Sequence, residues 1–147
     1  MTTLAELPDL VGQRLGPTEW RTMTQERVDE FAEVTEDHNY IHVDPERAKD
    51  SPFGGTIAHG YLSVAMLAPI SQSLLAVDDA RTSVNYGLDR LRFPAPLPVG
   101  REFRGIGEVT GVTEVKGGMQ VHVTFTLEVR DQERPALVAE CLFRYYA

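Results

Sequence analysis

Apolar and polar side chains alternate strictly between residues 120 and 130, and this is the clearest pattern along the chain. A period of two is typical of a β-strand that buries one face and exposes the other to water. Residues 84–93, 101–112 and 137–146 are predicted to form further strands, separated by turn-forming sequences at 116–119 and 131–135. The apolar positions of the alternating segment 120–130 are Val121, Val123, Phe125, Leu127 and Val129.

The first half of the chain has the spacing of helices. Thr24 is a residue type that caps helix N-termini, and the apolar positions after it follow a helical period, so residues 25–36 are predicted to form an amphipathic helix. Residues 60–75 carry no charged side chain, and a helix that is apolar nearly all round must be buried on most sides. Pro69 is expected to kink this second helix or to end its first half.

Residues 37–56 between these helices are polar and rich in Pro, Gly and Asp, and Pro45 is expected to start a short helix there. Two main helices followed by a run of antiparallel strands indicate an α+β fold. Because the uncharged helix needs a cover, we expect a single sheet to curl around it, which is the hot-dog arrangement. Neither a repeat nor a linker divides the 147 residues, so one domain over residues 1–147 is expected.

Composition narrows the function. The formal net charge of -8 repels phosphate backbones and anionic lipid, so partners among nucleic acids and membranes are not expected. The chain starts without the basic and apolar runs of a signal peptide, and residues 60–77 are too short and too polar for a membrane span, so a cytoplasmic location is expected. Cys141 is the one cysteine, which excludes an internal disulfide, and its apolar strand face predicts a buried structural thiol.

A carboxylate, an imidazole and a glycine are grouped around the start of the uncharged helix. His42 follows Asp37 by five positions, and Gly60, preceded by His59, begins the helix. Asp and His together suit the exchange of protons near neutral pH. The N–H groups at a helix N-terminus lack partners within the helix, so Gly60 can present one to a carbonyl oxygen. These groups predict chemistry next to a carbonyl.

Several separated motifs resemble one family. Asp37-x-Asn39-x-Ile41-His42 and Ala58-His59-Gly60 resemble the hydratase 2 motif of the MaoC-like (R)-specific enoyl-CoA hydratases and 3-hydroxyacyl-thioester dehydratases. Residues 85–88 (Asn-Tyr-Gly-Leu) and 92–100 are also similar, especially to the small single-domain actinobacterial and NodN-like members. The resemblance spans nearly the whole chain. One departure is Tyr40, which stands where the family usually has a proline.

The resemblance implies a hydro-lyase that reversibly hydrates a trans-2-enoyl thioester of coenzyme A or acyl carrier protein to the (3R)-3-hydroxyacyl thioester. Asp37 and His42 would hold the water, and which of them is the formal base stays open. The Gly60 N–H would face the thioester oxygen. The expected supporting or substrate-binding residues are Asn39, Tyr40, His59, Tyr86 and Gly87. A homodimer is implied, and neither a metal nor an organic cofactor is expected.

Two other functions were weighed for the same residues. A hot-dog acyl-CoA thioesterase would direct water at the thioester carbonyl, but the His42 partner and the Asn39 spacing argue against it. A non-catalytic acyl-thioester-binding module has no need of the Asp37/His42 pair. His38 and His42 have a spacing that binds metal on a helix, but Asn39 stands where the zinc-protease pattern has glutamate, and Asp and Asn favour loops. His38 is therefore interpreted as a bystander.

Overall fold

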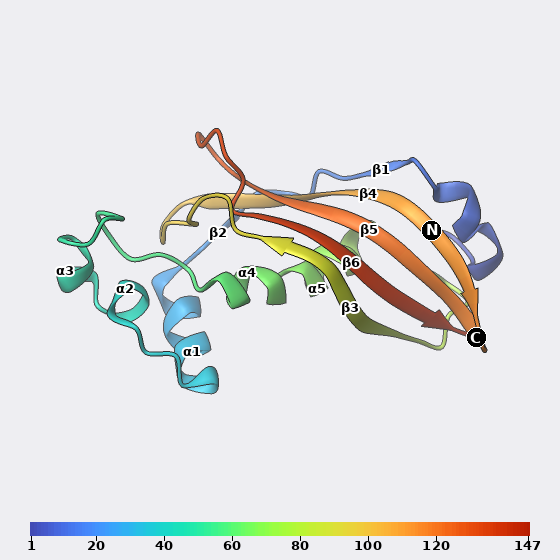
Figure 1. Ribbon diagram of the computed structural model, residues 1–147, viewed down its shortest axis with the longest axis horizontal. Helices are drawn as coiled ribbons and strands as arrows, with labels where there is room; N and C mark the ends of the chain where they lie inside the picture. Colours follow the sequence, from blue (N-terminus) through green and yellow to red (C-terminus); the bar gives the residue numbers. More distant parts are fainter.

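A sheet curled around an apolar helix dominates the computed structural model, which describes residues 1–147. The sheet has 6 strands in the order β1-β4-β5-β6-β3, with β2 also paired to β4, and all pairs are antiparallel. The strands arch over α4 and α5, while α1, α2 and α3 lie together beyond one end of the sheet (Figure 1). The architecture confirms the expected α+β class. The strands are β1 (Arg14–Leu15), β2 (Arg21–Thr22), β3 (Thr82–Arg92), β4 (Glu102–Val115), β5 (Gly118–Val129) and β6 (Leu137–Tyr146).

The burial pattern of β5 confirms the strand predicted from the alternation at residues 120–130. Every second residue of β5 from Val121 to Val129 is buried, and the residues between them are half-buried on the outer face. The neighbouring strands β4 and β6 bury the residues that pair with these positions, such as Phe103 and Ala139, so the three strands form one continuous core with the helices. Its largest fully buried side chains include Phe103, Phe125, Leu7, Met23 and Ile70.

The uncharged segment is divided into α4 (Gly60–Ala65) and α5 (Leu67–Leu74), with the break at Met66. The break lies three residues before Pro69, not at the proline itself. Proline has no N–H to donate to the carbonyl of Ala65, four residues earlier, and its ring crowds that carbonyl, so the helix is disturbed one turn ahead of it. No helix in the structure is long and apolar enough to cross a membrane.

The polar segment is more ordered than its composition suggested. After α1 (Gln25–Thr35), which Thr24 caps by accepting a bond from Arg27 N, the chain forms α2 (Tyr40–Val43) and α3 (Pro45–Ala48). Only α1 and α3 were predicted. A 3-10 helix, η1 (Leu4–Leu10), and the short strands β1 and β2 occupy the opening, which sequence patterns left irregular. Leu7 of η1 and Met23, which directly follows β2, are buried in the core.

Candidate active site

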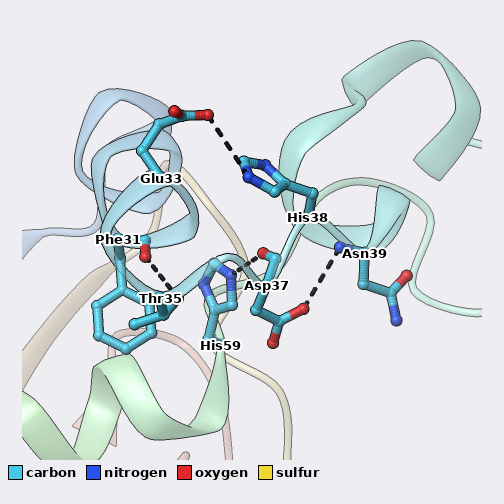
Figure 2. Close-up of polar contacts among 7 residues, drawn as sticks. All are labelled: Phe31, Glu33, Thr35, Asp37, His38, Asn39 and His59. Atoms are coloured by element: carbon cyan, nitrogen blue, oxygen red, sulfur yellow. Dashed lines mark hydrogen bonds and ion pairs between the residues drawn. The ribbon is translucent and has the colours of Figure 1, made fainter.

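Asp37 lies directly after α1, where Glu36 takes a left-handed backbone conformation with φ of 62° and turns the chain. Its side chain is exposed, and Oδ1 accepts a bond from the backbone N–H of Asn39 at 3.4 Å (Figure 2). The Asn39 side chain in turn caps α2 by accepting from Ile41 N at 3.3 Å. Asn39 thus fixes the loop between Asp37 and the helix that carries His42.

His42 is buried on α2, and its ring has a defined tautomer. Nδ1 lies 2.7 Å from the backbone oxygen of Ile57, and since a carbonyl only accepts, Nδ1 must carry the proton. Nε2 therefore keeps a lone pair. Burial lowers the pKa of His42 below its ordinary 6.5, and His59 acts in the same direction, while the Ile57 carbonyl and Asp37 oppose them. The lowered pKa favours the neutral form of the His42 ring.

The segment around Ile57 is held from both sides. Its N–H donates to the Ile41 carbonyl of α2 at 2.9 Å. On the other side, Ala58 N donates to Leu97 O and Val99 N to Thr56 O, both at 2.9 Å. The motif at residues 92–100 therefore serves this site by anchoring the strand-like segment that orients His42.

Gln25 is a site residue that sequence reasoning missed. From the first position of α1, its Nε2 donates to the His42 carbonyl at 2.7 Å, and its Oε1 accepts from the Thr56 hydroxyl at 2.6 Å. It therefore ties α1, α2 and the Ile57 segment together. A polar residue just after a helix cap is ordinarily solvated, so nothing in its sequence position marked this role.

His59 is the most deeply buried polar residue of the site, with an exposed fraction of 2%. Its ring stacks on that of His42, with centroids 3.9 Å apart and planes at 24°, and contacts Phe31 at 4.9 Å. Its Nε2 lies 3.0 Å from the backbone oxygen of Asp37 (Figure 2). The structure thus brings together Asp37, His42 and His59.

Each of these three residues offers one possible ligand atom, and these atoms lie within 4.8 Å of one another. A shared metal would need the in-plane lone pairs of both rings to converge on one point. The rings are instead stacked nearly parallel, and each already donates a hydrogen bond to a carbonyl. The arrangement suits proton transfer better than metal coordination.

Gly60 is the first residue of α4, so its N–H has no acceptor within the helix. A Cβ at this position would lie 2.9 Å from Cζ of Phe93, so a side chain there would require this exposed ring to shift. Both residues line a cavity of about 290 Å³ together with Ser63, Phe53 and the 94–97 segment. The backbone at Gly60 is thus accessible from a mostly apolar hollow.

Of the other predicted residues, Gly87 lines an apolar cavity of about 280 Å³ between the central helices and strands β3 and β6. Tyr86 does not reach it: its ring lies on the outer side, 55% exposed, with the Arg144 guanidinium 3.4 Å from its centroid. Tyr40 is the first residue of α2, and the Arg47 guanidinium lies over its ring, 4.0 Å from the ring centroid. The cavity is lined by Val64, Ala65, Leu67, Ala68, Asn85, Gly87, Leu88, Cys141, Leu142 and Phe143.

His38 points away from the site, as Figure 2 shows, and its Nε2 lies 3.6 Å from a carboxylate oxygen of Glu33 on α1. It therefore does not join His42. Cys141 is buried as expected, and burial raises the pKa of its thiol to about 12. A thiol with so high a pKa does not act as a nucleophile near neutral pH.

Comparison with known proteins gives a consistent result. Residues 6–132 match the family MaoC like domain. The chain is 43% identical over 146 residues to the 3-hydroxyacyl-thioester dehydratase Z of Mycobacterium tuberculosis. The aligned region covers 99% of this chain and 97% of that protein. It is 42% identical over 141 residues to Nodulation protein N of Rhizobium leguminosarum bv. viciae, covering 93% and 87% of the two chains.

Solved structures share the fold. R-Hydratase PhaJ1 from Pseudomonas aeruginosa superposes with a TM-score of 0.79 at 24% identity, covering 98% of this chain and 85% of that one. The (R)-hydratase from A. caviae involved in PHA biosynthesis gives a TM-score of 0.75 at 26% identity, covering 90% and 94%. The resemblance inferred from the motifs and the hot-dog fold are both confirmed.

Proposed function

Since the chain belongs to the MaoC-like dehydratase family and is a hydro-lyase, we propose that it reversibly hydrates trans-2-enoyl thioesters to (3R)-3-hydroxyacyl thioesters with Asp37 and His42 as its catalytic pair. The observation that carries the proposal is the protonation geometry of His42. Its Nδ1–H is committed to Ile57 O, and its unprotonated Nε2 belongs to a ring with a lowered pKa close to the Asp37 carboxylate.

In the hydration direction, His42 Nε2 accepts a proton from the attacking water while the Asp37 carboxylate holds that water by its other hydrogen. The water oxygen forms a bond to C3, and the C2–C3 π electrons move toward the thioester carbonyl. The protonated His42 then returns a proton to C2, so that one water is added in total. Asp37 stabilises the imidazolium that exists between these steps.

Negative charge develops on the thioester oxygen during the attack, and we assign its stabilisation to the N–H of Gly60. This donor is supported by its position at the start of α4 and by the cavity that reaches it. Water, a base and an oxyanion donor suffice for the reaction, so the proposal includes neither a metal nor an organic cofactor. The acyl thioester is the substrate, carried by coenzyme A or acyl carrier protein.

The cavity that includes Gly87 and Leu88 is proposed to receive the acyl chain, because its lining is apolar and lies along the central helices. Tyr86 has no part in that lining and is assigned to the outer surface instead.

A homodimer is proposed from the edge of the sheet. Strand β3 is the last strand on its side and is exposed along nearly its whole length, with Val84 and Leu88 among its exposed apolar residues. Tyr61 on neighbouring α4 is 74% exposed. An unpaired edge of this length presents free backbone N–H and C=O groups, and two copies of one edge can pair with each other about a twofold axis.

Incubation of the protein with crotonyl-CoA tests the proposed function. Loss of the enoyl absorbance without release of free thiol, and formation of the (3R) product, is the expected result. Release of free coenzyme A would instead identify a thioesterase. Tight binding of the thioester with no change in either signal would identify a binding module, and both results would reject the hydratase.

A further inference from the structure

His59 contacts every element that carries a proposed catalytic group, although it is not itself assigned a chemical step. Its ring covers that of His42, its Nε2 is bonded to the backbone of Asp37, and the next residue in the chain is Gly60. Figure 2 shows the ring extending from the start of α4 to the loop after α1. Residues 22 positions apart are joined by this one contact.

The side chain does not do what its position at the helix start suggests. His59 occupies the N-cap of α4, yet it makes no capping bond to that helix. Because the Asp37 carbonyl only accepts, His59 must donate from Nε2, and in the neutral ring Nδ1 is then an acceptor. That Nδ1 is buried and has no hydrogen-bond partner. A buried acceptor without a partner is unfavourable, so ordinary packing does not account for a histidine here.

We propose that His59 is a positioning residue for the hydration reaction, which holds the Asp37 backbone and the His42 ring in register with Gly60. This inference rests on the proposed function, since it assigns a role within that same site. The two contacts of His59 have different roles in this proposal. The stacked ring fixes the plane of the His42 ring, and the Nε2–H fixes the loop at Asp37.

Asp37 lies in a loop that Asn39 ties to α2 and that His59 ties to α4. Its carboxylate is exposed and is bonded within the chain only to Asn39 N, at a long 3.4 Å. The backbone bond to His59 is therefore the tie between this loop and the central helix. Reacting groups that shift by about 1 Å can lose about 10²-fold in rate, so this tie bears directly on turnover.

The ring of His42 is positioned by three neighbours. The Ile57 carbonyl holds its Nδ1, the side-chain amide of Gln25 donates to the His42 backbone carbonyl, and His59 covers one face of the ring. Of these three, His59 is the one that lies against the face of the ring, where it opposes a tilt about the Nδ1 bond. Nε2, which must reach the water, would move most in such a tilt.

Three variants separate the contacts. His59→Gln keeps an N–H near the position of Nε2 but loses the ring, His59→Phe keeps a ring but loses the donor, and His59→Ala loses both. We expect His59→Ala to lower kcat on crotonyl-CoA by about 30- to 100-fold with little change in KM. Each of the other two should recover part of that loss. His38→Gln, a neighbouring exposed histidine paired with Glu33, is the matched control and should keep the wild-type kcat.

Ring nitrogen NMR gives a readout that does not depend on turnover. In the wild type we expect His42 protonated at Nδ1 and His59 at Nε2, and we expect the His42 signals to shift in His59→Ala but not in His38→Gln. If the wild type does not hydrate crotonyl-CoA, the proposed function fails, while the NMR arm still decides whether His59 holds His42.

Two results would overturn the positioning role. The first is a folded His59→Ala variant whose kcat lies within about twofold of the wild type and whose His42 signals are unchanged. The second is an equal loss of kcat in all three variants in proportion to a loss of melting temperature, because that pattern belongs to a merely structural residue.

Discussion

The imidazole of His42 donates from Nδ1 to the carbonyl of Ile57 at 2.7 Å, which turns Nε2 into the free acceptor of the site. A backbone carbonyl thus selects the tautomer, as a carboxylate does for the histidine of many hydrolytic triads. Since Ile57 N is itself bonded to Ile41 O, the ring and the helix that carries it are fixed against the same residue.

Substitution of either member of the proposed pair should abolish most of the activity and leave the fold intact. His42→Gln and Asp37→Asn are each expected to lower kcat by about 10²- to 10⁴-fold, because each removes a group that holds or moves the proton. Crotonyl-CoA kinetics measure the loss, and circular dichroism verifies the fold. The double variant should be little worse than the singles, since the two residues act as a unit. Wild-type turnover in either single variant would refute the mechanism.

The activity should decline on the acid side of neutrality. Because burial lowers the pKa of His42 from its ordinary 6.5, the neutral base persists to lower pH, and kcat/KM should fall only as the pH drops below 6.5. The unfolded chain binds this proton more readily than the folded one. The free energy of unfolding that His42 contributes is therefore fully present above pH 6.5 and is lost as the pH falls through the folded-state pKa.

A pH profile of kcat/KM, with melting temperatures measured at each pH, checks both effects. In His42→Gln, the melting temperature should no longer show the His42 contribution to its decrease between pH 6.5 and the folded-state pKa of His42. An acid limb of kcat/KM centred above pH 6.5 in the wild type would contradict the assignment of His42 as the neutral base.

Patterns that are local in sequence were readable before the structure. The alternation that predicted residues 137–146 encodes burial directly, and β6 has those bounds. The position of α2 was not predicted, because its first turn is created by the side chain of Asn39 in a segment whose composition is that of a loop. Tyr86 and Gly87 were both expected at the acyl pocket, but Gly87 lines the cavity while the Tyr86 ring lies on the outer side, and the register shifts of β3 in this segment were not readable from the sequence.

The candidate site divides in the same way. Asp37 and His42 were predicted because both belong to one short motif that precedes Gly60, and the structure brings the two side chains close together. The carbonyl of Ile57 was not, since a backbone group has no signature in the sequence. The contacts of Gln25 with Thr56 and of His59 with Asp37 depend on how distant segments pack, which spacing alone does not encode.

A side chain at position 60 should displace the Phe93 ring and obstruct the proposed oxyanion donor. In Gly60→Ala the new Cβ would meet the Phe93 ring at 2.9 Å, which should cost about 1–3 kcal/mol in the free energy of unfolding. It should also lower kcat/KM by about 10²-fold, because the methyl group displaces the thioester from the Gly60 N–H. Urea unfolding and crotonyl-CoA kinetics measure the two effects separately.

The double variant Gly60→Ala/Phe93→Ala distinguishes packing from chemistry, with Phe93→Ala alone as its reference. Removal of the ring should restore much of the stability that Gly60→Ala loses, but the activity should stay low. Recovery of both in the double variant would mean that Gly60 is needed only to accommodate Phe93, and the proposed oxyanion role would be lost.

Interruption of the β3 edge should separate the proposed dimer. In Val84→Glu a charge is placed on the exposed edge, while Arg144 lies directly opposite on β6 and can pair with it, so the fold of each copy should be retained. Light scattering should give twice the chain mass of 16.4 kDa for the wild type and a single chain mass for the variant. Val34→Glu makes the same substitution at an exposed valine on α1 and should remain dimeric. A monomeric wild type, or a Val84→Glu variant that stays dimeric, would show that β3 is not the interface.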